Sequence, residues 1–136
     1  MRDDNCIFCK LANGDIPTNT IYEDADFRVI LDASPAAKGH ALILPKQHYA
    51  NMFEIGDEVL AKAAKLAKKV ITHEKEVLGC DGYNVLQNNG EAAGQTVFHF
   101  HMHLIPRKAG DQAVPEWEHL SLSDDEMKEI CDKMKM

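Results

Sequence analysis

The chain has 136 residues, of which 45% are hydrophobic and 27% charged, and it carries a net charge of −7. This length and composition fit one compact domain with a buried core, spanning residues 1–136. The acidic balance argues against nucleic acid and anionic membranes as partners, because proteins that bind them usually carry basic patches. The sequence contains neither a run of about 18 apolar residues nor an apolar signal segment at its start, so we expect a cytoplasmic protein.

The first half of the sequence predicts a short helix followed by three strands. The helix is expected over residues 6–12 and is followed by the helix-ending pair Asn-Gly. Residues 20–23 and 26–32 predict two strands joined by a hairpin turn. Residues 39–44 form an apolar run stopped by Pro45, which indicates a third strand.

The second half predicts one long helix, two more strands and a final helix. Between Ile55 and Leu78, apolar or small residues recur at helical spacing, and lysines occupy the other face. Strands are expected over 83–88 and 97–105, and an amphipathic helix begins near Ser123, which precedes three acidic residues. These elements predict an α+β fold: an antiparallel sheet with one long helix, a short N-terminal helix and a C-terminal helix.

Three histidines alternate along the predicted strand over 97–105. Successive side chains of a strand point to opposite faces, so His99, His101 and His103 are expected to project together, spaced by about 6.6 Å. The residues that alternate with them are apolar and are expected to face the core: Phe98, Phe100, Met102 and Leu104.

This pattern permits three interpretations, namely a solvated polar face, a three-histidine zinc site, or nucleophilic and acid–base chemistry by neutral imidazoles. The loop ahead of the histidines bears on the choice. Gly94 lets the backbone approach a ligand, and Gln95 and Thr96 supply donors that suit phosphate oxygens. A glycine-containing loop is by itself equally consistent with a plain hairpin connection, and the histidine spacing alone does not separate a metal site from a nucleophile.

The stretch from Gly94 to Ile105 resembles the signature of the histidine-triad (HIT) family, His-φ-His-φ-His-φ-φ with φ apolar. The resemblance extends to about residue 110 and is closest to the Hint-like branch of that family. It includes Cys6-Ile-Phe-Cys-Lys, Gly14-Asp-Ile-Pro, Tyr22-Glu-Asp, Leu31-Asp-Ala-Ser-Pro and Gly39-His-Ala-Leu-Ile-Leu-Pro-Lys. It implies a single HIT domain over residues 1–136, with a C-terminal tail over about 110–136, that forms a homodimer.

The resemblance implies a nucleotide hydrolase or transferase that acts at the α-phosphorus of nucleoside phosphoramidates or dinucleoside polyphosphates. His101 would be the nucleophile and form a covalent nucleotidyl-histidine, which divides one barrier into two smaller ones. His103 would bond the phosphate oxygens, a backbone carbonyl near His99 would set the tautomer of His101, and His40 matches a fourth family histidine. No organic cofactor is expected, and a purine nucleotide is the favoured substrate.

The resemblance also implies the nucleotide contacts. Asp32 would accept hydrogen bonds from ribose hydroxyls, although a solvated turn residue is the alternative interpretation of this position. The residues expected at the phosphate are Asn88, Gln95, Thr96 and Val97. The apolar slot for the base would consist of Ile7, Phe8, Leu11 and Ile30, for most of which ordinary core packing is also expected.

A second site is predicted around two of the four cysteines. The spacing of Cys6 and Cys9 allows two thiolates to share one ion, but it is also compatible with two buried thiols. The pair resembles that of zinc-carrying bacterial members of the family, which implies His48 and His99 as the remaining ligands. A closed Cys2His2 site has no open position for water, so the zinc would be structural.

The sequence leaves the leaving group open. The N-terminal half resembles nucleoside phosphoramidate hydrolases, whereas residues 104–111 resemble dinucleoside polyphosphate hydrolases. Two alternatives to the nucleophilic enzyme are a non-enzymatic nucleotide-binding or interaction module on the same fold and a zinc-dependent hydrolase. The segment around Trp117 is a candidate to cross a dimer interface or to pack on its own subunit.

Overall fold

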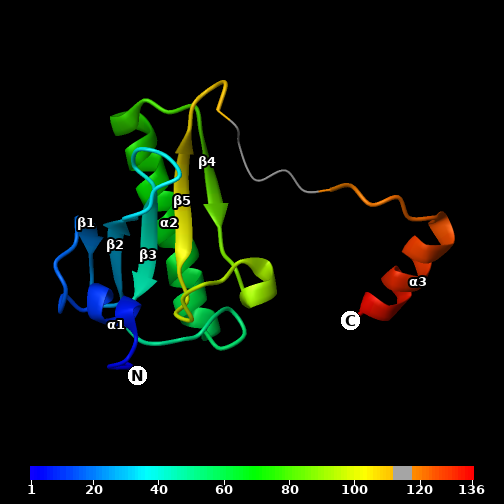
Figure 1. Cartoon of the computed structure of the whole chain (residues 1–136), viewed down its shortest axis with the longest axis horizontal. Helices are drawn as coiled ribbons and strands as arrows, with labels where there is room; N and C mark the ends of the chain where they lie inside the picture. Colours follow the sequence, from blue (N-terminus) through cyan, green and yellow to red (C-terminus); the bar gives the residue numbers. More distant parts are fainter. Residues whose placement is uncertain (112–117) are drawn as a thin grey trace.

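The computed structural model describes residues 1–111 and 118–136. Its centre is a five-stranded sheet with strand order β1-β2-β3-β5-β4, in which all neighbouring strands are antiparallel (Figure 1). The strands are β1 (Thr20–Glu23), β2 (Phe27–Leu31), β3 (Ala41–Pro45), β4 (Gly82–Leu86) and β5 (Met102–Arg107). Within these described ranges, no helix is both long enough and apolar enough to span a membrane.

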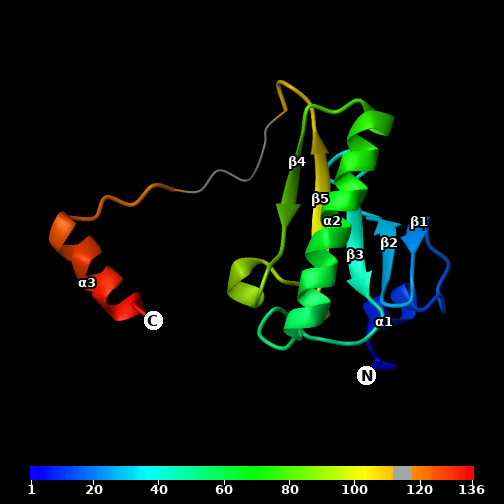
Figure 2. The ribbon, with the colours of Figure 1, turned by 180° about the vertical axis from the view of Figure 1, so that it is seen from behind.

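Helices lie on both faces of this sheet. The long helix α2 (Asp57–Leu78) crosses one face, as Figure 2 shows, and the short α1 (Ile7–Ala12) contacts β2 and β3. A 3-10 turn, η1 (Glu91–Ala93), lies between β4 and β5. The C-terminal helix α3 (Asp124–Met134) is exposed along its whole length. The α+β class and the three predicted helices are therefore confirmed.

The central strands are buried on both faces, which explains their nearly continuous apolar sequence. Alternate residues of β2 and β3, among them Val29 and Ile43, pack toward α2 in the larger core. Ile30 and Leu42 point the other way and form a smaller cluster with Ala12 of α1. The sheet therefore holds α1 and α2 in a fixed relation on opposite sides of one strand pair.

Most predicted boundaries agree with the structure to within two or three residues. The strand over 20–23 coincides with β1, and the final helix begins after Ser123, whose side chain forms a capping box with Glu126. The long helix begins at Asp57 because Gly56 takes the extended N-cap conformation, and it ends where Gly79 adopts a left-handed conformation.

The predicted strand over 97–105 is wrong in its first half. The ladder between β3 and β5 runs only from Ala41↔Leu104 to Ile43↔Met102, so residues 97–101 lie ahead of β5 rather than in it. The backbone of this segment forms hydrogen bonds outside the sheet, since the Phe100 amide donates to the Tyr49 carbonyl at 2.6 Å. Correspondingly, Phe98 is 49% exposed instead of facing the core, while the three apolar residues expected beyond it are buried: Phe100, Met102 and Leu104.

Truncation of a core phenylalanine should test this packing. Phe27 of β2 is 2% exposed, so we expect Phe27→Ala to lower the free energy of unfolding by about 3–5 kcal/mol through lost burial and an unfilled cavity. Phe53→Ala, at a side chain that is 88% exposed, is the matched control and should change stability by less than about 0.5 kcal/mol. Urea denaturation measures both, and equal losses in the two variants would contradict the described core.

Candidate functional site

A cavity of about 780 Å³ opens between α1, the segment after β2 and the loop that leads into β5. Part of its lining is apolar and includes Phe8, Leu11, Ile30 and Leu42. Polar residues complete the lining, among them Asp32, Asn88, Thr96, His101 and His103. This combination of an apolar wall with a few converging polar groups is typical of small-molecule sites.

His101 lines this cavity, and one of its two ring nitrogens is held by a hydrogen bond to the backbone. Its Nδ1–H donates to the backbone carbonyl of His99 at 2.7 Å, so Nε2 carries the lone pair. Burial lowers the pKa of His101, which favours the neutral imidazole. The ring of Phe8 packs edge-on against it, with 4.9 Å between centroids. His101 is thus held in one orientation, with an unprotonated Nε2 that could act as a nucleophile.

A second chain of hydrogen bonds sets the tautomer of His103. The backbone amide of Ala36 donates to His40 Nδ1 at 2.9 Å, so the proton of that ring is on Nε2. His40 Nε2–H in turn donates to His103 Nδ1 at 2.9 Å, which leaves the His103 proton on Nε2. His103 therefore offers a donor where the adjacent His101, 4.9 Å away between centroids, offers a lone pair.

The surroundings keep His40 and His103 neutral. Burial lowers the pKa of His103 to about 4, and the neighbouring His101 and His40 add to this effect. Burial also lowers the pKa of His40, although the Asp32 carboxylate, with Oδ2 at 3.4 Å from His40 Nε2, acts in the opposite direction. The other oxygen of this carboxylate, Oδ1, accepts the Ser34 amide at 2.8 Å, which holds the side chain at the cavity wall.

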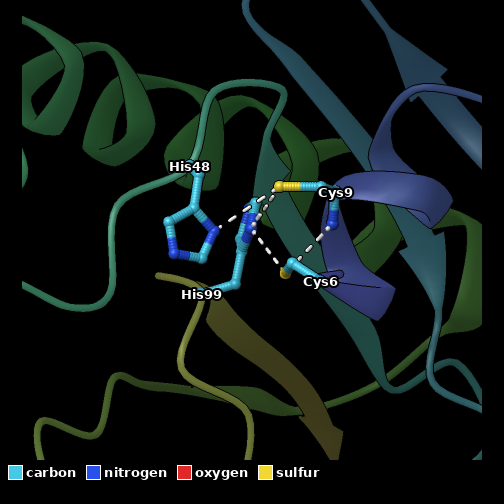
Figure 3. Close-up of side chains that lie close together, drawn as sticks. All are labelled: Cys6, Cys9, His48 and His99. Atoms are coloured by element: carbon cyan, nitrogen blue, oxygen red, sulfur yellow. Dashed lines mark hydrogen bonds between the residues drawn. The ribbon is translucent and has the colours of Figure 1, made fainter. Parts of the chain in front are cut away.

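The four predicted metal ligands lie together (Figure 3). His99 Nδ1 is 3.4 Å from both Cys6 Sγ and Cys9 Sγ, and His48 Nδ1 is 3.5 Å from Cys9 Sγ. A tetrahedral ion with Zn–S bonds of about 2.3 Å and Zn–N bonds of about 2.0 Å places sulfur and nitrogen about 3.5 Å apart. The residues present therefore fit a four-coordinate zinc ion.

The far side of the His99 ring completes this arrangement. Its Nε2–H donates to the Pro45 carbonyl at 2.8 Å, so the Nδ1 lone pair faces the sulfurs, as a zinc ligand requires. Burial lowers the pKa of His99 to about 4, which keeps the ring neutral. By contrast, the 2.9 Å between His40 Nε2 and His103 Nδ1 is shorter than the roughly 3.3 Å that two ligands of one zinc ion would show, so that pair is a hydrogen bond.

Three residues expected to contact the nucleotide lie away from the cavity wall. Ile7 is 47% exposed, and neither Gln95 nor Val97 is among the residues that line the cavity. Gln95 is buried and ties the loop together: its Oε1 accepts the Gly90 amide at 2.8 Å, and its Nε2 donates to two carbonyls, one of them that of Val97. The Trp117 segment lies outside the described residues.

Sequence reasoning missed part of the wall. Residues 17–19 and 33–35, and Leu42 of β3, also line the cavity. These residues belong to no catalytic or ligand-binding motif, so the sequence offered no signal for them. The Ala36 amide was equally invisible, since its role follows only from the position of His40.

Comparison with known proteins agrees with this geometry. Residues 13–110 match the HIT domain family. The chain belongs to the HIT family. The expected resemblance is thereby confirmed, and the match covers the cavity wall from residue 17 onward together with all three histidines of the triad.

Relatives and solved structures extend this likeness to nearly the whole chain. The chain is 42% identical to adenosine 5'-monophosphoramidase hnt1 of Schizosaccharomyces pombe, with 96% of this chain and 99% of that protein covered. The crystal structure of SMU.412c from Streptococcus mutans UA159 is similar with a TM-score of 0.90 at 36% identity, over 97% of this chain and 84% of that chain. A Zn-bound histidine triad family protein from Mycobacterium smegmatis has a TM-score of 0.76 at 38% identity, over 82% and 84%.

The lowered pKa values predict a loss of stability in acid. In the folded HIT protein, the pKa values of His40 and His103 lie below the ordinary 6.5, and that of His103 is lowered to about 4. As the pH falls, these two histidines therefore become protonated in the unfolded chain before they do in the folded protein. The stability that these neutral histidines contribute is fully present above about pH 6.5 and is lost as the pH falls toward about 4.

Urea denaturation at a series of pH values measures this loss. His103→Gln should flatten the decline between pH 6.5 and 4, and His73→Gln on the exposed face of α2 is the control that should leave it unchanged. Equal declines for the wild type and His103→Gln would contradict the assignment.

Proposed function

We propose that this HIT protein is a nucleotide hydrolase or transferase that cleaves at the α-phosphorus of a nucleoside phosphoramidate or dinucleoside polyphosphate. The observation that carries the proposal is the pairing of a lone-pair nitrogen on His101 with an N–H donor on His103 at the same cavity. The name of the hnt1 relative, an adenosine 5'-monophosphoramidase, supports the phosphoramidate class and an adenine base.

The proposed reaction has two steps. His101 Nε2 attacks the α-phosphorus, a P–N bond forms, and the bond to the amine or nucleotide leaving group breaks as that group takes up a proton from solvent. A water molecule then attacks the same phosphorus, the P–N bond to His101 breaks, and the water gives up a proton to solvent, so that free imidazole and nucleotide result. His103 Nε2–H and the Thr96 hydroxyl, which line the same cavity, are the proposed donors to the phosphate oxygens, whose charge they would stabilise in both steps.

The rest of the cavity fits a nucleoside. The Asp32 carboxylate is an acceptor that suits ribose hydroxyls, and it lies beside the histidine pair. Phe8, Leu11 and Ile30 offer an apolar surface for the base. Because apolar contacts separate similar bases only weakly, the site favours a flat base without selecting one purine strongly.

The Cys6, Cys9, His48 and His99 cluster is proposed to hold a structural zinc ion. The Zn-bound structural neighbour from Mycobacterium smegmatis and the interatomic distances both support this. The chemistry that zinc supplies there is a cross-link between α1, the segment after β3 and the approach to β5. A closed set of four protein ligands argues against the zinc-dependent hydrolase. The homodimer and the cytoplasmic location stay predictions.

Removal of the nucleophile should separate the enzyme from a mere binding module. His101→Ala is expected to lower kcat for adenosine 5'-monophosphoramidate by at least about a thousandfold while AMP still binds, because the other wall residues remain. Intact-mass measurement after rapid quenching should detect one nucleotidyl group on the wild-type protein and none on the variant. His73→Gln is the control, and a variant that retains full turnover would favour the binding-module alternative.

Metal analysis tests the structural site. Protein purified without chelator should contain about one zinc per chain, and Cys9→Ser should lower both the zinc content and the thermal unfolding midpoint. Cys131→Ser, at an exposed thiol in α3, is the matched control and should leave both unchanged. A wild-type protein without zinc would refute the assignment.

A further inference from the structure

The two thiols of the cluster differ in their access to solvent. Cys6 is partly exposed and is the N-cap residue of α1, whereas Cys9, one turn later, is fully buried. Oxidation of cysteines follows exposure and thiolate character, and zinc-bound cysteines are thiolates. Of the two residues, Cys6 is the one with some contact to solvent, so its sulfur is the first candidate for oxidation and Cys9 is the thiol that follows.

The same two sulfurs are close enough to join. The ligand atoms of the cluster all lie within 4.8 Å of one another, and the Cys9 amide donates to Cys6 Sγ at 3.4 Å. A disulfide bond of about 2.05 Å then requires a closure of less than about 3 Å, which side-chain rotation at the first turn of a helix can supply. The Cys-x-x-Cys spacing at a helix start is the arrangement that such disulfides use.

The cluster is connected to the nucleotide cavity by two routes. The helix that carries both cysteines also carries Phe8, whose ring packs on His101 and lines the cavity. In addition, His99 belongs to the cluster through its ring and holds His101 Nδ1 through its backbone carbonyl. A change in the sulfur ligands therefore reaches the reacting imidazole through both a side chain and a carbonyl.

We infer that Cys6 is an oxidation site, and that a Cys6–Cys9 disulfide releases the metal and weakens nucleotide binding. The inference rests on the proposed metal site and deepens the proposed function as its regulation.

The chemistry balances with hydrogen peroxide as the oxidant. The Cys6 thiolate attacks one peroxide oxygen, the O–O bond breaks, and a sulfenic acid and hydroxide form. The Cys9 thiolate then attacks the Cys6 sulfur and displaces a second hydroxide, so the two thiolates lose two electrons and the peroxide gains them. The metal ion loses both sulfur ligands and retains only imidazole donors.

The test uses the full-length, zinc-loaded protein and hydrogen peroxide. We expect zinc release, followed with a chromogenic chelator, to match the amount of Cys6–Cys9 disulfide found by peptide mass spectrometry. The affinity for AMP, measured by calorimetry, should fall about tenfold and recover after thiol reductant and zinc are added. Disulfide formation with the zinc retained, or an unchanged AMP affinity in the oxidised protein, would overturn the inference.

Two variants keep the test sharp. Cys131→Ser removes the exposed thiol of α3 and should behave as the wild type does. His48→Asn keeps both sulfurs and removes a nitrogen ligand, so its disulfide should form at a lower peroxide concentration than in the wild type. A His48→Asn variant that forms no disulfide would count against the inference.

These readouts do not depend on turnover. Failure of AMP to bind the reduced, zinc-loaded protein would instead count against the proposed function.

Discussion

The bonds made by His99 connect the two sites of this protein. Its ring donates to the Pro45 carbonyl at the end of β3 and turns its other nitrogen toward Cys6 and Cys9. Its backbone carbonyl accepts the Nδ1–H of His101 and so decides which nitrogen of that ring is free. One buried residue thus links the sheet, the cysteine cluster and the imidazole that is proposed to react. Loss of its orientation would disturb all three, because its ring and its backbone carbonyl are bonded to each of them.

Burial provides the second constraint. The imidazoles around the cavity are largely withdrawn from water, and desolvation lowers their pKa values, to about 4 for His99 and His103. Neutral rings can act as nucleophile, donor or metal ligand according to which nitrogen carries the proton. Fixed backbone groups determine which nitrogen carries the proton: the Ala36 amide donates to His40, and the His99 carbonyl accepts from His101. The architecture therefore converts three chemically identical side chains into different functional groups.

The local patterns of the sequence predicted most helices and strands correctly, but they failed for the segment just ahead of β5, which lies outside the sheet. The apolar period of α2 and the capping residues of α3 are local properties, so their prediction succeeded. The alternation around His99 and His101 looked like a strand, but the β3–β5 ladder ends at Met102. Gln95 shows the same limit: its amide suits a phosphate oxygen as well as it suits the loop carbonyls that it bonds in the structure.

The sequence by itself determined the family and the α+β class and named the candidate reactive groups, because motif spacing and hydrophobic period are encoded in short stretches of chain. Only the tertiary structure decided which nitrogen each histidine presents and which residues share a wall. Those properties depend on partners distant in sequence, such as Pro45 for His99 and His40 for His103. These hydrogen bonds and the metal ligand set join segments that are far apart in the sequence, and those segments meet only when the chain folds.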